Sequence, residues 1–255
     1  MTPPFRTASA LSTIPHGFFG RQGGVSTGEL ASLNTGIGSG DDPAAIAENR
    51  RRVAEAVLPG AALVGVYQVH GRDCVAVDAP WDDAHRPHAD ALVTDRPGIL
   101  LGILTADCVP VLLADPDAGV VGAVHAGWKG AHAGVTDATV AAMLGKGARA
   151  AAITAAIGPC IATASYEVDM GFIDRFVAED AANDRFFHAG RPGHAHFDIA
   201  AYVAARLAAV GVTRIEIIGD DTCALEDDYF SYRRSCHAQE NGYGRQLSVI
   251  GIAPE

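Results

Sequence analysis

The sequence contains no CxxC pair, and its five cysteines (Cys74, Cys108, Cys160, Cys223 and Cys236) are an odd number scattered along the chain. A disulfide framework needs an even set of cysteines, and a zinc ribbon or a thioredoxin-like motif needs closely spaced ones. The sequence therefore predicts neither. It is typical of a protein that works in a reducing compartment, and we expect the cytoplasm.

Basic residues are also scarce: 19 Lys and Arg stand against 30 Asp and Glu, which gives a formal net charge of −11. Proteins that bind nucleic acids usually gather basic residues on one face, whereas the single cluster here is Arg50–Arg52, on a predicted helix. We expect this triplet to form a solvated helix face and the protein not to bind nucleic acid. An anionic substrate would need positive groups gathered locally.

No long hydrophobic run is present. The most apolar segment, GILLGILTADCVPVLLADP, is interrupted by Asp107 and Pro110, so it predicts two buried strands and no membrane span. The N-terminus lacks a basic segment followed by an apolar stretch, so we expect no secretion signal. A membrane partner is not expected.

The 255 residues include 49% hydrophobic ones, which is enough for a packed core, and no internal repeat or linker is visible. We predict a single domain over residues 1–255. The clearest helix lies at 39–60, where Asp41 or Asp42 caps the first turn and Pro59-Gly60 ends the helix.

Short Val/Leu/Ile-rich segments divided by Gly, Pro and Asp predict a series of strands. Because these segments are almost continuously apolar and do not alternate, we expect the strands to be covered on both faces by helices, in an α/β fold. The predicted strands lie at 62–71, 73–78, 89–94, 99–104, 110–115, 119–127, 213–220 and 245–252, and the covering helices at 133–144, 168–180 and 197–211.

Three residues that can bind a metal stand where a predicted strand meets a turn: His70 in YQVHG, Cys108 in LTADCVP and His125 in AVHAGW. Strand ends can bring distant residues together on a rigid frame. The intervals between these residues match no local zinc-finger pattern. From the residues alone, a metal site and a set of ordinary core side chains remain equally open.

Longer motifs carry a family resemblance over nearly the whole chain. They run in the order RQGGVSTGELASLNTG, GDDPAAIAENRRR, QVHG, ADALVTDRPGILLGILTADCVPVLLADP, AVHAGWKG, IGPCI with YEV, and FSYRR. In this order they resemble the YfiH-like family, also called the laccase-domain or multicopper polyphenol oxidase family, which is regarded as purine nucleoside phosphorylases with adenosine deaminase activity. The resemblance implies a layered α/β/β/α sandwich with mixed sheets.

The resemblance also implies a zinc ion held by His70, Cys108 and His125, three ligands that leave one tetrahedral position open, as in catalytic zinc sites. Zinc lowers the pKa of bound water toward neutrality, which suits deamination of adenosine. A single site with one thiolate and two imidazoles does not match the several centres of a laccase, so bound copper would be adventitious.

Phosphorolysis of a purine nucleoside needs a phosphate site and neutralisation of the departing base. Arg21, together with the backbone amides of Gly23 and Gly24, is the predicted oxyanion site, with an ordinary glycine turn as the alternative. The resemblance also places Asn34 and Arg233 near the site. Lys129 is predicted to steer anionic substrates, unless it only covers Trp128.

Asp107 is predicted either to orient a metal ligand or to act as a general base, provided that its side chain faces the site. Cys160 is expected to be a buried small residue and Trp128 to be a packing residue. Many relatives carry a histidine where this chain has Gly38, so a substrate role of that histidine cannot be transferred. His132 is expected on a helix surface, and His85, His188, His194 and His196 in loops.

The predicted function is therefore zinc-dependent phosphorolysis of adenosine, inosine or S-methyl-5′-thioadenosine, with adenosine deamination as a second activity and a nucleoside and phosphate as partners. One alternative is an amidase that releases L-serine from a UDP-linked muramyl peptide precursor. The others are a copper-dependent polyphenol oxidase and a non-enzymatic purine-binding or interaction module. The sequence does not predict the oligomeric state.

Overall fold

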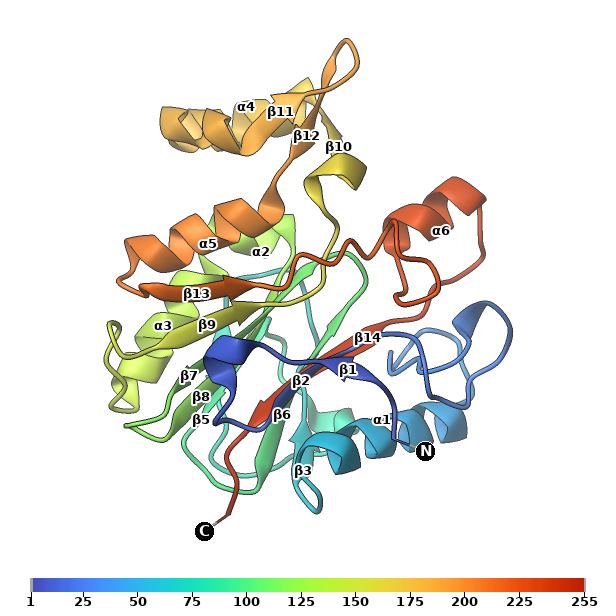
Figure 1. Cartoon of the computed structure of the whole chain (residues 1–255), viewed down its shortest axis with the longest axis vertical. Coiled ribbons are helices and arrows are strands. Elements are labelled where there is room, and N and C mark those ends of the chain that lie inside the picture. Colours follow the sequence, from blue (N-terminus) through green and yellow to red (C-terminus); the bar gives the residue numbers. More distant parts are fainter. Residues whose placement is uncertain (1, 255) are drawn as a thin grey trace.

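The computed structural model describes residues 2–254, which form two large mixed β-sheets stacked face to face, with helices on both outer faces (Figure 1). A smaller sheet and one helix stand at the top of this view, beside the stacked sheets. Among residues 2–254, no helix has the length and apolar character that crossing a bilayer would require.

The first large sheet has five strands, in the order β1-β2-β14-β6-β3, and only β3 and β6 run parallel. The last strand of the chain, β14, lies in the middle of this sheet, between β2 and β6. The bounds are β1 (Phe5–Arg6), β2 (His16–Phe19), β3 (Ala62–Val64), β6 (Ile99–Thr105) and β14 (Gln246–Gly251).

The second large sheet has six strands, in the order β13-β9-β7-β8-β5-β4. Its central pairs are antiparallel, whereas β13 with β9 and β4 with β5, at the two edges, are parallel. The bounds are β4 (Cys74–Ala76), β5 (Ala91–Thr94), β7 (Val109–Asp115), β8 (Val120–Ala126), β9 (Thr154–Ile157) and β13 (Arg214–Ile217).

The two sheets share an apolar core that alternate residues of their strands fill. Leu101 and Ile103 of β6 contribute from one sheet, and Leu112 of β7 and Val121 of β8 contribute from the other. Because side chains alternate along a strand, the remaining residues of β7 and β8 face the opposite side, where they are also buried. This explains the continuous apolar runs in the sequence.

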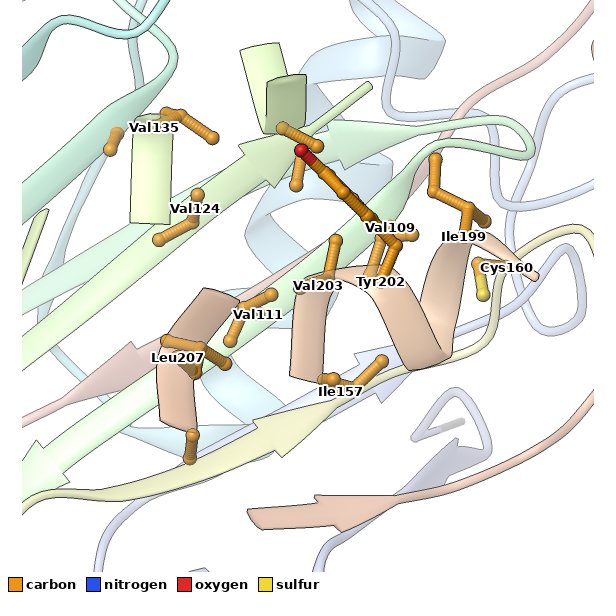
Figure 2. Packing of buried hydrophobic residues seen from close by; sticks show 14 of the residues in the cluster. Val109, Val111, Val124, Val135, Ile157, Cys160, Ile199, Tyr202, Val203 and Leu207 are labelled. Carbon is orange, nitrogen blue, oxygen red and sulfur yellow. The ribbon is translucent and has the colours of Figure 1, made fainter. Parts of the chain in front are cut away.

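Helices cover the outer faces, so that the predicted α/β/β/α layering is confirmed. Helix α1 (Pro43–Val57) packs Val53 against Leu100 and Val249 of the five-stranded sheet. Helices α3 (Val135–Gly145) and α5 (Ile199–Ala209) cover the six-stranded sheet, where Tyr202, Val203 and Leu207 lie over β7 and β9 (Figure 2).

The remaining elements surround one end of the sandwich. The small sheet has the order β10-β12-β11. The bounds are β10 (Glu167–Asp169), β11 (Phe187–Ala189), β12 (His194–Phe197), α2 (Trp128–Ala133), α4 (Met170–Glu179) and α6 (Tyr232–Ala238), with 3-10 turns at Ser9–Leu11, Gly28–Leu30, Asp83–His85, Thr163–Ser165 and Ala181–Phe186.

The predicted helix at 39–60 is confirmed with shorter bounds, and it is Asp42 whose carboxylate accepts a hydrogen bond from the backbone amide of Ala44. The predicted strand at 62–71 was too long. It ends at Val64, and the following residues form an irregular segment in which His70 has a φ of 60°. This departure from a strand lies at the predicted metal ligand.

Two surface predictions need correction. Arg50 is not on the solvated face, because its side chain is only 12% exposed and faces Asp83, whereas Arg51 is 61% exposed as expected. Of the histidines predicted in loops, His188, His194 and His196 lie in strands of the small sheet, and His85 lies in a 3-10 turn.

Gly158 lies where the two large sheets approach each other closely. It follows β9, and a Cβ atom added there would lie 2.2 Å from a ring carbon of Phe18 in β2. We expect Gly158→Ala to lower the free energy of unfolding by about 1–3 kcal/mol, as overpacking does. Thermal and denaturant unfolding would measure the change.

Gly145→Ala is the matched control, because nothing lies within 4 Å of an added Cβ at the end of α3. Alanine is the better helix former, so this change should leave stability equal or raised by about 1 kcal/mol or less. Equal stability of the two variants would contradict tight packing at Gly158.

Candidate metal centre and adjoining clefts

His70, Cys108 and His125 converge, as the sequence predicted. Their ligand atoms all lie within 4.8 Å of one another, and Cys108 Sγ is 4.0 Å from His70 Nε2. The two imidazole rings have centroids 4.8 Å apart and are nearly perpendicular. The described residues form one such group of three possible metal ligands.

Strand pairing brings these residues together. The chain leaves the five-stranded sheet at the end of β6 and enters the six-stranded sheet at the start of β7, and Cys108 stands in the turn between them. His125 lies on the neighbouring strand β8, opposite Pro110. Asp107 in the same turn has a φ of 81°, in the left-handed region that few residues other than glycine adopt. The crossing between the sheets therefore fixes the position of the thiol.

A fully buried carboxylate, Asp90, ties two of the ligands together. It accepts hydrogen bonds from the backbone amides of Val69 (3.2 Å), His70 (2.9 Å) and Gly71 (2.6 Å), and its Oδ1 lies 2.8 Å from His125 Nδ1. These contacts hold the left-handed backbone at His70. They also direct the other ring nitrogen of His125, Nε2, to the metal centre.

Charge at the centre suits a cation. Burial opposes ionisation of the Cys108 thiol, but the charge of His125 and hydrogen bonds from both imidazoles outweigh it and lower the thiol pKa to about 6. Burial would raise the pKa of Asp90, yet its hydrogen bond with His125 and the charge of that ring keep it below the usual range. A thiolate is the form of cysteine that binds metals.

Two glycines leave room for this arrangement. A Cβ atom at Gly127 would lie 2.8 Å from a ring carbon of His70 and 3.1 Å from Cys108 Sγ. A Cβ atom at Gly130 would lie 2.6 Å from the carbonyl oxygen of Gly71. The HAGWKG motif therefore packs its backbone directly against the ligand residues.

The donor set fits a metal ion. One thiolate and two imidazoles match the ligands of zinc and of other borderline metals, and donor atoms of a tetrahedral site stand about 3.5 Å apart, given the usual bond lengths. Side-chain adjustment of about 1 Å would bring the three atoms to that spacing. His70 is exposed to solvent and Cys108 is partly exposed, so the centre is accessible from outside.

The carboxylate of Asp107 is bound by three hydrogen-bond donors of the protein, which does not suit a role as a free base. Its carboxylate accepts hydrogen bonds from the hydroxyls of Thr222 (2.7 Å) and Ser231 (3.0 Å) and from the backbone amide of Arg233 (2.6 Å). These contacts favour the first of its two predicted roles, in which it orients the turn that carries Cys108.

The larger of two clefts at the centre has a volume of about 720 Å³ and lies between the small sheet, α2 and α6. His70 and Cys108 are part of its wall. Trp128, Tyr166 and Phe172 supply aromatic surface, and Trp128 also packs on Phe172, with ring centroids 5.0 Å apart. The predicted packing role of Trp128 is confirmed, and the cleft has room for a purine nucleoside.

Arg233 and Lys129 both line this larger cleft. Nη1 of Arg233 donates to the carbonyls of Ser165 and Glu167, and its guanidinium lies 5.4 Å from the ring centroid of Tyr166. Lys129 Nζ lies 5.6 Å from the ring of Trp128. Both remain candidate substrate contacts.

A smaller cleft of about 320 Å³ reaches the same three ligands from another direction. It is formed by Gly38, the segment before His70, the end of β6 and the residues just before β14. His70, Ala106 and Cys108 belong to the walls of both clefts, so the metal centre stands between them.

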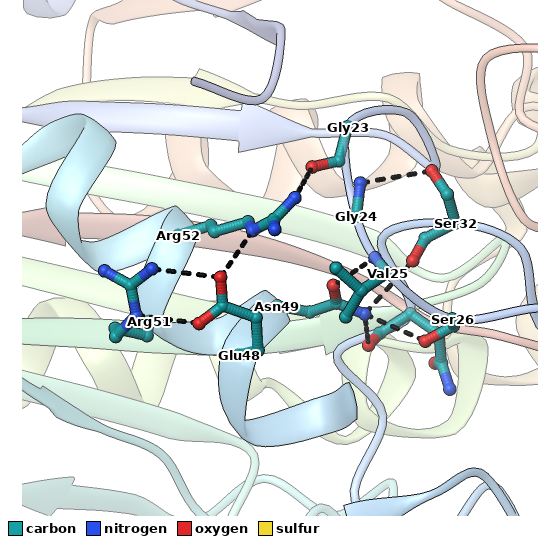
Figure 3. Close-up of polar contacts among 10 residues, drawn as sticks. Gly23, Gly24, Val25, Ser26, Ser32, Glu48, Asn49, Arg51 and Arg52 are labelled. Carbon is teal, nitrogen blue, oxygen red and sulfur yellow. Dashed lines mark hydrogen bonds and ion pairs between the residues drawn. The ribbon is translucent and has the colours of Figure 1, made fainter. Parts of the chain in front are cut away.

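The residues predicted to form an oxyanion site, Arg21, Gly23 and Gly24, line neither of these clefts. Arg21 donates to the carbonyls of Ala31, Glu29 and Glu226 and lines neither cleft. The amide of Gly24 donates to Ser32, and the carbonyl of Gly23 accepts from Arg52 (Figure 3). These contacts favour the ordinary turn that was the alternative prediction.

Asn34 is fully buried, and its hydrogen bonds go to protein groups. Its Nδ2 donates to Ser39 and Asp41, and its Oδ1 accepts from the amides of Gly36 and Arg245. It does not contact either cleft directly, but it positions the backbone of Arg245, which lines the smaller one.

Several site residues were missed. Asp90 in ADALVT was taken as part of a strand, although a carboxylate within an apolar run is unusual and is buried only when it is paired. Arg245 also stood inside a predicted strand, and Thr105 followed the predicted strand at 99–104 directly, whereas in the structure it is the last residue of β6. Cys160 is buried in the apolar core as expected, and burial raises the pKa of its thiol.

The fold and the centre define a class of α/β/β/α protein with an accessible group of three side chains that could hold a metal ion. Residues 15–253 match the family model described as multi-copper polyphenol oxidoreductase laccase. The chain belongs to this laccase-like family.

Curated relatives span nearly the same length. A Streptomyces griseus protein named purine nucleoside phosphorylase is 46% identical over 90% of this chain and 92% of its own. A Deinococcus radiodurans protein with the same name is 42% identical over 94% of this chain and 89% of its own.

Solved structures agree with the fold. A Neisseria meningitidis protein assigned to the DUF152 family superposes with a TM-score of 0.87 at 29% identity and covers 100% of both chains. YlmD from Geobacillus stearothermophilus superposes with a TM-score of 0.86 at 30% identity, over 98% of this chain and 99% of its own.

Substituting Asp90 should loosen the metal centre. In Asp90→Asn one oxygen is replaced by an NH₂ group, which cannot accept hydrogen bonds from the amides of the His70 segment. Residues that orient metal ligands typically contribute 10–100-fold to affinity, so we expect a loss of about that size. Competition with a chromogenic chelator would measure it.

Asp117→Asn is the matched control, because this carboxylate is 79% exposed and pairs with Arg149 at the surface. It should leave metal affinity unchanged. If both variants bind the metal as tightly as the unchanged protein does, Asp90 does not support the metal centre.

Proposed function

We propose that the protein is a zinc-dependent purine nucleoside phosphorylase that also deaminates adenosine. The observation that carries the proposal is the accessible His70–Cys108–His125 centre, of which His70 and Cys108 line an aromatic cleft. Support comes from relatives 46% and 42% identical that bear the name purine nucleoside phosphorylase. Adenosine, inosine and S-methyl-5′-thioadenosine are the proposed substrates.

In phosphorolysis, a phosphate oxygen forms a bond to C1′ of the ribose while the bond between C1′ and N9 of the purine breaks. The electron pair of the broken bond stays on the purine, which takes up a proton from water. The products are ribose 1-phosphate and the free base. The protein must hold the two reactants in line and stabilise the charge that develops on the base.

The residues of the larger cleft suit the nucleoside. Aromatic side chains stack on purines, and Tyr166 and Phe172 offer such surfaces beside the centre. Arg233 is held in place by carbonyls of the segment that carries Tyr166. The zinc ion, when bound by the three ligands, would supply a Lewis acid next to the reacting groups.

Zinc is the proposed metal, although the name of the family model refers to several copper ions. The part of the chain that the structure describes holds one group of three donors, which is enough for one ion. Three protein ligands with an open fourth position are the usual set of a catalytic zinc site.

Turnover tests the proposal directly. The protein, purified without added metal and with its metal content measured, is incubated with inosine and phosphate, and hypoxanthine is measured by chromatography. We expect hypoxanthine and ribose 1-phosphate in equal amounts, and inosine from adenosine when phosphate is omitted. No hypoxanthine at high enzyme concentration would reject phosphorolysis. Serine release from the muramyl precursor would favour the amidase instead.

Removal of the metal should abolish activity and leave the fold. Loss of a catalytic metal removes several kcal/mol of stabilisation of the transition state, so we expect turnover to fall by about 100–1000-fold after dialysis against a chelator or in Cys108→Ser. Added zinc should restore the turnover of the dialysed protein but not that of Cys108→Ser.

Circular dichroism and thermal unfolding provide the second measurement. A catalytic centre predicts a folded Cys108→Ser protein, whereas the non-enzymatic alternative with a structural metal predicts a large loss of stability. Cys236→Ser is the matched control, because Cys236 is an exposed cysteine in α6 that lines neither cleft.

A further inference from the structure

The smaller cleft contains two hydrogen-bond donors that the protein itself does not satisfy. Among the residues that the structure describes, the buried side-chain atoms without a hydrogen-bond partner are Thr105 Oγ1 and Arg245 Nη1. Thr105 is only 2% exposed. Buried polar groups are nearly always paired, so two orphaned donors on one cleft indicate a missing ligand.

The charge of the cleft indicates the sign of that ligand. Arg245 and Arg86 both line it, and the wall contains no Asp or Glu. The larger cleft, by contrast, contains the carboxylates Asp107, Glu167 and Asp169 beside its basic residues. Although the protein has a net charge of −11, the smaller cleft is therefore locally basic and suited to bind an anion.

The protein also holds Arg245 in position. Its backbone amide donates to buried Asn34, its carbonyl accepts from Thr35, and its Nη2 lies 3.3 Å from the hydroxyl of Tyr243. A Cβ atom at Gly36 would lie 3.1 Å from Arg245 Nη1, so glycine there leaves room for the guanidinium. A fixed arginine with one free nitrogen suits a tetrahedral oxyanion.

The position of the cleft matches the reaction. In-line displacement requires the phosphate and the departing purine to lie on opposite sides of C1′. The two clefts meet at His70, Ala106 and Cys108. A nucleoside whose base lies in the larger cleft and whose C1′ lies at this junction would have the smaller cleft on the side opposite its base, where the attacking phosphate must stand.

We propose that the smaller cleft is the phosphate subsite, in which Arg245 and Thr105 donate hydrogen bonds to the attacking phosphate. The identity of the anion rests on the proposed phosphorolysis, whereas the site for an oxyanion rests on the two unpaired donors. Gly38 lines this cleft, and nothing lies within 4 Å of a Cβ atom added there. Asn34 acts as a positioning residue through Arg245.

Phosphate binding tests this assignment in the purified protein with its metal in place. Equilibrium dialysis with radioactive inorganic phosphate compares the unchanged protein, Arg245→Met and Thr105→Val, and steady-state kinetics give KM for phosphate and for inosine. Arg149→Met is the matched control, because this arginine is 70% exposed and lines neither cleft.

We expect Arg245→Met to weaken phosphate binding and raise KM for phosphate by about 10–100-fold, as loss of a charged hydrogen bond does, with little change in KM for inosine. Thr105→Val should weaken binding by about 3–10-fold. Its melting temperature should stay equal or rise, because a methyl group replaces an unpaired hydroxyl. If Arg245 acted only in folding, its substitution would not raise KM for phosphate selectively over KM for inosine.

Phosphate affinity of Arg245→Met equal to that of Arg149→Met would overturn the subsite, even if inosine is phosphorolysed normally. A rise confined to KM for inosine would also overturn it. Arg245-dependent phosphate binding in a protein that cleaves no nucleoside would support the oxyanion site and reject phosphorolysis. Inosine 5′-monophosphate tests whether the bound anion is instead the phosphate group of a nucleotide. If this nucleotide binds in a manner that depends on Arg245 and inorganic phosphate does not, the site belongs to a phosphate carried by the substrate.

Discussion

The buried carboxylate of Asp90 is the interaction on which the metal centre depends. It joins a backbone segment in a left-handed conformation, which carries His70, to the imidazole of His125 on a strand of the six-stranded sheet. A buried carboxylate is stable only when its oxygens are paired, and here four donors pair them. Each partner therefore holds the others, and neither histidine can move without exposing an unpaired charge.

The stacked sheets supply the frame for this interaction. The chain passes from one sheet to the other at the turn that carries Cys108, and Asp107 in that turn is fixed by Thr222, Ser231 and Arg233 from near the C-terminal end. Segments from all parts of the chain thus meet at one edge of the sandwich. The clefts that adjoin the centre are built from the small sheet, α2, α6, the end of β6 and the segments that connect these elements.

Much of this could be predicted from the sequence, because continuous apolar runs and a capped helix carry a clear signal. The three possible metal ligands were identified because each lies in a motif of the family at the end of a predicted strand, although the strand before His70 ends at Val64 in the structure. Asp90 and Arg245 were missed because their roles depend on partners more than ten positions away, and no local pattern distinguishes them from ordinary strand residues. Thr105 was missed because nothing in the sequence shows that its hydroxyl is buried without a hydrogen-bond partner. Arg21 was chosen for its glycine-rich neighbourhood, yet nearby carbonyls bind its guanidinium.

The placement of β14 has a consequence for biosynthesis. This strand follows every other helix and strand of the sandwich in the sequence, but it lies between β2 and β6 and supplies Val249 and Ile250 to the apolar layers on either side of its sheet. Until β14 has been synthesised, both neighbours have an open edge and an uncovered apolar surface, which is the condition under which nascent chains associate. The five-stranded sheet can therefore close only after all the other described elements of the sandwich have been made.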